Sequence, residues 1–184
     1  MHATTIPADR VDAFARAATA VGSEVHRVGT IAEAGAFARD LAAGAPVLAT
    51  PEVADDAVLR AALGDDVLVT AVAADAADRP VAVERVVLGV AETGSVLVRE
   101  ADRASRLASM LARTLVQVVE AGDLVDGLDD AGAWLAAHAH EGYAALVTGP
   151  SRTADIERVL TVGVQGPARL ILVIVEPSIG DAGR

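Results

Sequence analysis

The chain has 184 residues, of which 53% are hydrophobic but only 2% aromatic, and its formal net charge is −11. All 15 of its cationic side chains are Arg and no basic patch is visible, which argues against nucleic acid or an anionic membrane surface as partners. The chain has no Cys, so it cannot hold a cysteine-ligated iron–sulfur cluster. We therefore expect no cofactor in this chain, and any redox centre must belong to another protein.

Length and composition predict one folded domain over residues 1–184. Because aromatic residues are few, Ala, Val, Leu and Ile must build the core, and abundant Ala suits helices packed on a Val-rich sheet. No run of about 18 apolar residues appears, and residues 1–7 lack the pattern of a signal peptide. We expect a cytoplasmic protein without a membrane span.

The first half of the chain alternates between helix and strand signals. Thr30 and Glu33 have capping-box spacing at the start of one helix, and Gly residues stand where helices would end. The predicted elements are helices at 7–22, 30–44 and 50–64, and strands at 25–28, 46–49 and 67–72.

The second half continues this alternation after a loop predicted at 75–79. A strand is expected over 81–90, although Glu84 and Arg85 interrupt its apolar run. The remaining elements are strands at 95–98, 116–119, 143–147 and 170–175, and helices at 103–113 and 129–138. Apolar runs without in-and-out patterning predict an α/β fold with an open, mostly parallel sheet and helices on both faces.

Residues 146–157, Leu-Val-Thr-Gly-Pro-Ser-Arg-Thr-Ala-Asp-Ile-Glu, predict a strand, a turn and a helix. Gly149 and Pro150 break the strand, and the hydroxyl of Ser151 or Thr153 can cap the exposed amides that open a helix. The apolar face of this helix would carry Ile156, Val159 and Leu160.

Helix N-termini bind anions, because unpaired N–H groups and the helix dipole point to the same place. We therefore expect a small carboxylate or phosphate at this turn. The ligand-binding residues would be Gly149, Pro150, Ser151, Arg152, Thr153 and Asp155. The alternative is that Ser151 and Asp155 only cap the helix, and that Arg152 pairs with Asp155.

A second block, Val90-Ala91-Glu92-Thr93-Gly94-Ser95-Val96-Leu97, places a carboxylate before a Thr-Gly-Ser turn. Partial desolvation would raise the pKa of Glu92 and suit it to acid–base or acyl-acceptor catalysis, whereas a turn carboxylate in water is the alternative. Thr93, Gly94 and Ser95 are the predicted ligand-binding residues of this block. The hydroxyls of Thr93 and Ser95 can donate hydrogen bonds to a ligand, or these can be plain strand and turn residues, and Gly94 fits a backbone role.

Other catalytic motifs are missing from the sequence. The four His residues do not form a recognisable ligand set, and the Asp pairs fit solvated helix caps, so we expect no metal site. No Walker loop, nucleophile elbow or Gly-x-Gly-x-x-Gly motif is found.

Both blocks resemble the LUD domain family, which includes the lactate utilization protein C (LutC)-like proteins. The stretch 146–157, with Thr161-Val162-Gly163-Val164-Gln165-Gly166-Pro167 and the strand 170–175, is similar to the C-terminal signature of the family. Residues 91–95 resemble its Ala-Glu-Thr-Gly-Ser/Thr segment. The likeness covers 80–176, and residues 1–79 form a divergent N-terminal part.

The resemblance implies a NagB/RpiA/CoA-transferase-like fold, with both blocks at the carboxyl ends of strands. It implies an accessory subunit of a system that oxidises L-lactate to pyruvate, with iron–sulfur partner proteins carrying the electrons. The alternative is a stand-alone enzyme acting on a small carboxylate, acyl-CoA or sugar phosphate with Glu92 as base or nucleophile. Residues 111–116 depart from the family, because neither the Pro nor the His of many members occurs near Ala112 and Leu115.

Overall fold

The computed structural model describes residues 8–77, 79–100, 102–138, 142–154, 160–162 and 166–176. Its helices are α1 (Ala8–Ala20), α2 (Ile31–Ala42), α3 (Pro51–Asp55), α4 (Ala57–Leu63), α5 (Ala73–Ala76), α6 (Arg103–Leu111), the 3-10 turn η1 (Ala121–Asp123) and α7 (Leu128–Ala137). Its strands are β1 (Glu24–Val28), β2 (Val47–Ala49), β3 (Val67–Leu68), β4 (Val81–Arg85), β5 (Leu88–Val90), β6 (Ser95–Arg99), β7 (Thr114–Glu120), β8 (Leu124–Val125), β9 (Ala144–Val147), β10 (Arg152–Ala154), β11 (Leu160–Val162) and β12 (Arg169–Val175).

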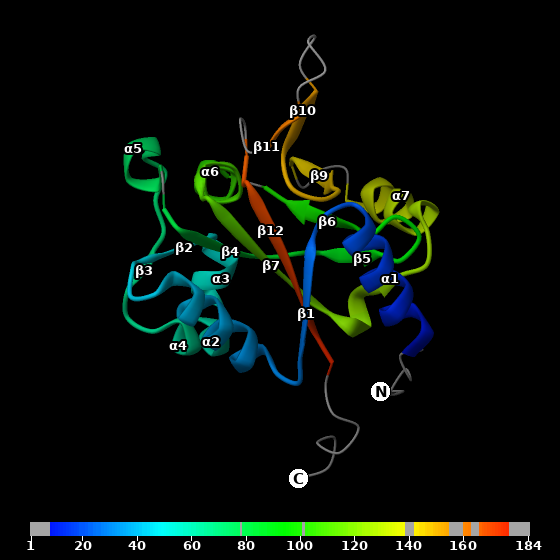
Figure 1. Cartoon of the computed structure of the whole chain (residues 1–184), viewed down its shortest axis with the longest axis horizontal. Coiled ribbons are helices and arrows are strands. Elements are labelled where there is room, and N and C mark those ends of the chain that lie inside the picture. Colours follow the sequence, from blue (N-terminus) through cyan, green and yellow to red (C-terminus); the bar gives the residue numbers. More distant parts are fainter. Residues whose placement is uncertain are drawn as a thin grey trace.

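A six-stranded sheet in the order β1-β12-β7-β4-β2-β3 forms the centre of the molecule (Figure 1). Every strand pair in it is parallel. A second sheet in the order β8-β5-β6-β9 is mainly antiparallel. The predicted α/β fold with an open parallel sheet is confirmed.

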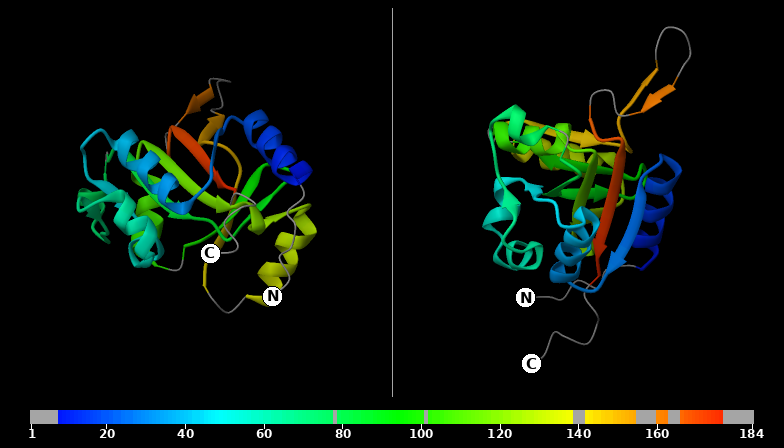
Figure 2. Two further views of the ribbon diagram at one scale, coloured as in Figure 1. Left: turned by 90° about the horizontal axis from the view of Figure 1, so that it is seen from below. Right: turned by 60° about the vertical axis from the view of Figure 1, so that its left-hand side comes forward.

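Both faces of the six-stranded sheet are covered (Figure 2). One face packs on α2, α3 and α4, which contribute Ala34, Ala38, Val53, Leu59 and Leu63 to a buried cluster. The other face packs on α1, α5, α6 and the four-stranded sheet. The helix α7 lies outside the four-stranded sheet and packs on it through Ala131.

The strand β7 explains why the apolar runs in this sequence are nearly continuous. Val116 and Val118 face the α2–α4 layer, whereas Leu115 packs with α6 and Val119 with the α1 cluster. Successive side chains of a strand point to opposite faces, so a strand buried on both faces needs apolar residues at almost every position.

Several predicted elements are divided in the structure. The helix expected over 50–64 is interrupted at Asp56, whose carboxylate accepts hydrogen bonds from the backbone N–H groups of Val58 and Leu59 and so caps α4. The strand expected over 81–90 becomes β4 and β5, which belong to different sheets. The loop predicted at 75–79 overlaps α5. The capping box of Thr30 and Glu33 is confirmed.

The helix predicted after Gly149 and Pro150 is wrong. Residues 152–154 form β10, which pairs antiparallel with β11 so that Thr153 lies opposite Thr161. Pairing with residues 160–162 satisfies these backbone groups instead, and a local sequence window does not reveal this partner. Asp155, Ile156 and Val159 lie outside the described residues.

A carboxyl group lies buried in the middle of the parallel sheet. Glu84 of β4 is opposite Gln117 of β7, and their exposed fractions are 3% and 0%. The Gln117 Nε2 atom donates to Glu84 Oε1 at 2.5 Å. Burial, with a smaller contribution from nearby Glu100, raises the pKa of Glu84 to about 7, against the opposing effect of the Gln117 hydrogen bond.

This pKa predicts how stability depends on pH. The ordinary pKa of a Glu carboxyl is 4.5, so the folded chain holds the proton of Glu84 more tightly than the unfolded chain does. The stabilisation of the folded state by the Glu84 proton is fully present below pH 4.5 and is lost as pH rises through about 7. That loss amounts to roughly 3 kcal/mol at most. We expect Glu84→Gln, which stays neutral, to gain stability relative to wild type as pH rises from 5 to 8.

Urea unfolding of both proteins at each pH measures this difference. Comparing the two proteins at the same pH removes the contribution of all other titrating groups. A difference that stays constant across the range would show that Glu84 does not hold the proton.

Candidate functional site

The two sequence blocks meet through the strand β6. Residues 92–94 form the turn between β5 and β6, which pair antiparallel with Val90 opposite Ser95. Residues 148–150 follow β9, which pairs with the other edge of β6 so that Val96 lies opposite Val147. We call these two segments the signature turns. Ser95 thus lies beside Thr148, and their hydroxyl oxygens are 2.7 Å apart.

Three hydroxyl groups form a connected chain at this point. Thr93 Oγ1 donates to Ser95 Oγ at 2.8 Å and also accepts from the Ser95 backbone N–H at 3.3 Å. If Thr93 donates to Ser95, the Ser95 proton goes to Thr148 Oγ1, and the Thr148 proton remains for an outside acceptor. Ser95 is 3% exposed whereas Thr148 is exposed, so this hydroxyl chain runs from the interior to the surface.

Glycine in each signature turn permits close packing on the end of α1. Gly94 has φ +68° and Gly149 has φ +71°, a region that disfavours side chains. A Cβ at Gly94 would lie 2.2 Å from the Ala18 backbone N, and one at Gly149 would lie 2.4 Å from the Val21 carbonyl oxygen. Both glycines therefore have a backbone role, as expected for Gly94.

A third segment of the sequence signature joins the site. The Ser151 N–H donates to the Pro167 carbonyl at 3.1 Å, and a Cβ at Gly166 would lie 3.0 Å from Ser151 Cβ. Gly166 and Pro167 directly precede β12, and the end of α1 directly precedes β1. The site therefore lies at the amino edge of the parallel sheet.

Each block follows the carboxyl end of a strand, as predicted, but these strands are β5 and β9 of the second sheet. The signature turns belong to the antiparallel sheet, where β9 runs toward the amino edge of its larger neighbour. A general rule for parallel sheets does not apply to turns held by a second sheet.

Glu92 is not desolvated, which corrects the basis on which it was predicted to be catalytic. Its side chain is exposed, and its Oε2 atom accepts from the Leu128 N–H at 3.3 Å. Its own N–H donates to the Asp126 carbonyl at 3.0 Å. Glu92 thus caps the N-terminus of α7, where the helix dipole favours a carboxylate.

The other predicted binding residues are only partly described. Arg152 and Thr153 contribute backbone to β10, and Asp155 lies outside the described residues. Because no helix begins at Ser151, the expected dipole at that point is absent. Any anion binding here must use the hydroxyl chain and turn amides.

A family model described as the LUD domain matches residues 11–175. The chain belongs to the LUD domain family. The match begins at residue 11, so it includes most of the divergent N-terminal part, residues 1–79.

Curated relatives and a solved structure agree with this family. The chain is 30% identical over 91 residues to "Lactate utilization protein C" of Geobacillus sp. (strain WCH70), and 33% identical over 92 residues to the protein of that name from Bacillus licheniformis. Each alignment covers 47% of this chain and only 38% of the relative. A crystal structure of a DUF162 family protein from Deinococcus radiodurans has a TM-score of 0.70 at 21% identity, covering 91% of this chain and 97% of that one. That likeness supports the fold.

The structure of this LUD domain accounts for one departure from the family sequence. Ala112 and Leu115, near the expected Pro and His, are each 2% exposed and pack with Leu170 in the cluster beneath α6. These positions belong to the core of this chain.

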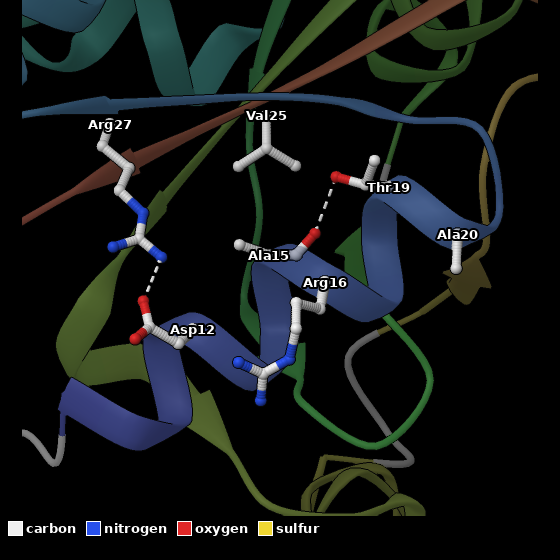
Figure 3. Close-up of a pocket in the computed structure, with 7 residues that line it drawn as sticks. All are labelled: Asp12, Ala15, Arg16, Thr19, Ala20, Val25 and Arg27. Atoms are coloured by element: carbon white, nitrogen blue, oxygen red, sulfur yellow. Dashed lines mark hydrogen bonds and ion pairs between the residues drawn. The ribbon is translucent and has the colours of Figure 1, made fainter.

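The LUD domain has surface hollows away from the hydroxyl chain. A groove of about 650 Å³ lies between α1 and β1, where Arg27 bonds to Asp12 at 2.6 Å (Figure 3). Another hollow, of about 440 Å³, is lined by Glu92, Asp126 and Arg10, and Arg10 pairs with Asp126 at 2.6 Å. Only the second contains a residue predicted from the sequence signature.

An ionic cluster at the carboxyl edge of the sheet was missed by sequence reasoning. Arg85 at the end of β4 bonds to Asp56, between α3 and α4, at 2.7 Å and also to Glu120 at the end of β7. Burial raises the pKa of Asp56, but hydrogen bonds from Leu59, Arg85 and Val58 outweigh it and leave that pKa lowered. The Arg85 guanidinium is therefore already engaged in internal ion pairs with carboxylates at this edge. Arg85 looked only like an interruption of an apolar strand.

The described residues show neither a metal-binding cluster nor a membrane-spanning helix. They contain no cluster of three acidic or His side chains arranged to hold a metal ion. None of the helices in the described ranges is long and apolar enough to cross a membrane.

The packing of the signature turns predicts the effect of Gly94→Ala. A methyl group there meets the α1 backbone, and φ is positive, so we expect a loss of more than about 2 kcal/mol in the free energy of unfolding. The matched control is Gly132→Ala in α7, where nothing lies within 4 Å of the new Cβ. That change should stabilise by up to about 1 kcal/mol, since Ala favours helix. Equal effects in urea unfolding would contradict the packing.

Proposed function

We propose that this LUD domain serves in lactate utilization, as an accessory subunit of a cytoplasmic system that oxidises L-lactate to pyruvate. The observation that carries the proposal is the meeting of the signature turns and residues 166–167 at one place on the surface. The name of the curated relatives supports the metabolic setting. Because the chain has no Cys, we assign electron transfer to iron–sulfur partner proteins.

We further propose that the exposed end of the hydroxyl chain binds a small carboxylate such as lactate. Thr148 can offer its hydroxyl proton, and the following backbone carries further donors. A hydrogen bond to a charged group contributes about 1.5–3 kcal/mol. The net charge of −11 repels anions at long range, so affinity must come from these local donors.

A calorimetric titration of the purified chain with L-lactate tests the ligand. Thr148→Val removes the hydroxyl and keeps the shape of the side chain, and we expect it to weaken binding by about tenfold or more. The matched control is Thr70→Val, which removes a hydroxyl that bonds only to the local backbone N–H of Val72. Equal affinities for both variants, or no binding by wild type, would contradict this site.

Deletion of the gene tests the proposed system. We expect growth on L-lactate to fail, to be restored by the wild-type gene, and to be restored less well by Thr148→Val. Iron–sulfur proteins should copurify with the tagged wild-type chain. Unchanged growth together with no such copurification would contradict the role.

A stand-alone enzyme is the second candidate, and one observation favours it. Glu92 lines the 440 Å³ hollow together with Arg10, so a carboxylate and a guanidinium face one small space. This function requires turnover of a small carboxylate, acyl-CoA or sugar phosphate by the purified chain alone. Loss of that turnover in Glu92→Gln, with the fold intact, would establish this candidate over the accessory role.

A further inference from the structure

A separate cavity of about 300 Å³ lies at the other end of β6 from the hydroxyl chain. Its lining residues include Arg99, Trp134, Leu135, His138, Tyr143 and Ala144, and we call it the ring cavity. The helix α7 supplies one wall, and the paired ends of β6 and β9 supply the other, since Arg99 lies opposite Ala144. Ser95 and Arg99 mark the two ends of β6, so the two sites are about 13 Å apart.

The aromatic residues of this chain are distributed unevenly. It has one Trp and one Tyr, and both line the ring cavity. Phe14 is fully buried and Phe37 packs against the core, so the two Phe side chains serve the interior. Tyr143, in contrast, is 54% exposed. The Trp and Tyr side chains, which combine an apolar ring with a polar group, thus lie around one small cavity.

Trp134 and His138 stack face to face on the α7 side of the cavity. Their ring centroids are 4.1 Å apart and their planes differ by 12°. His138 Nδ1 lies 2.8 Å from the Trp134 carbonyl, which can only accept, so Nδ1 carries a proton. Within the described residues, neither the Trp134 indole N–H nor the Tyr143 hydroxyl has a hydrogen-bond partner.

The cavity is lined by a guanidinium and by the C-terminal end of a helix. Arg99 brings a positive charge to the rim, whereas the C-terminal end of α7 presents the negative end of the helix dipole. A guanidinium plane also stacks on aromatic rings. Shape and stacking therefore decide the ligand more than its charge does.

We propose that the ring cavity binds a neutral planar heteroaromatic ring of the nucleobase class. The ring stacks on the outer face of the Trp134–His138 pair, and its polar edge meets the Tyr143 hydroxyl. A volume of about 300 Å³ is at the lower limit for ligand sites, which suits one or two fused rings. This site is independent of the lactate role.

Fluorescence of the single Trp reports directly on this cavity. We expect adenosine to quench it saturably, and ribose over the same concentration range to leave it unchanged. Tyr143→Ala should weaken adenosine binding by about fivefold, because it removes the hydroxyl that bonds to the ring. Arg99→Gln should also weaken it. The matched controls are Leu146→Ala, an exposed side chain on β9 outside the cavity, and Arg103→Gln on the surface of α6; both should bind as wild type does.

A linear, unsaturable quench would overturn the proposal. So would equal adenosine affinities in wild type, Tyr143→Ala and Arg99→Gln when circular dichroism shows that all three are folded. Since the titration uses purified protein without lactate, its failure leaves the outcome of the growth experiment unaffected.

Discussion

The pairing of β6 with both β5 and β9 is the contact on which the candidate site depends. It brings together Ser95 and Thr148, which are 53 residues apart in the sequence. The register is well determined, because Val96 and Val98 of β6 face the α1 cluster and a shift by one residue would turn them away from it. The glycines of the signature turns then let both turns contact α1. The site is thus a consequence of core packing, and its hydroxyl geometry is fixed before any ligand arrives.

Much of the fold follows from local sequence patterns. The run in β7 is apolar at nearly every position because both faces of that strand are covered, and this pattern alone indicates a parallel sheet between helices. Thr30 and Glu33 mark the start of α2 because a capping box is a contact between near neighbours in sequence. In contrast, the division of 81–90 between two sheets depends on partners far along the chain. No local window contains that information.

The candidate site was less predictable for the same reason. The residues of both blocks were recognised, and Thr93, Ser95 and Gly149 do come together. Their environment was not foreseen, because the helix at 152 is replaced by a hairpin and Glu92 is held by α7. Glu84 and Arg85 were seen only as interruptions of a strand, since a charged residue in a strand has no distinctive spacing. What they do depends on Asp56, Glu120 and Gln117, which other strands and loops supply.

Buried carboxyl groups make the layer beneath α6 energetically unfavourable. Glu100 is 8% exposed, and its carboxylate accepts a hydrogen bond from Ser109 Oγ at 2.5 Å. Its backbone N–H donates to the Tyr143 carbonyl. Glu84 lies close enough for Glu100 to raise its pKa, and the buried Ser105 hydroxyl has no partner among the described residues. Two carboxyls in one apolar layer are tolerated only when hydrogen bonds replace lost hydration. An apolar layer would therefore fold at lower cost than one that holds Glu84 and Glu100.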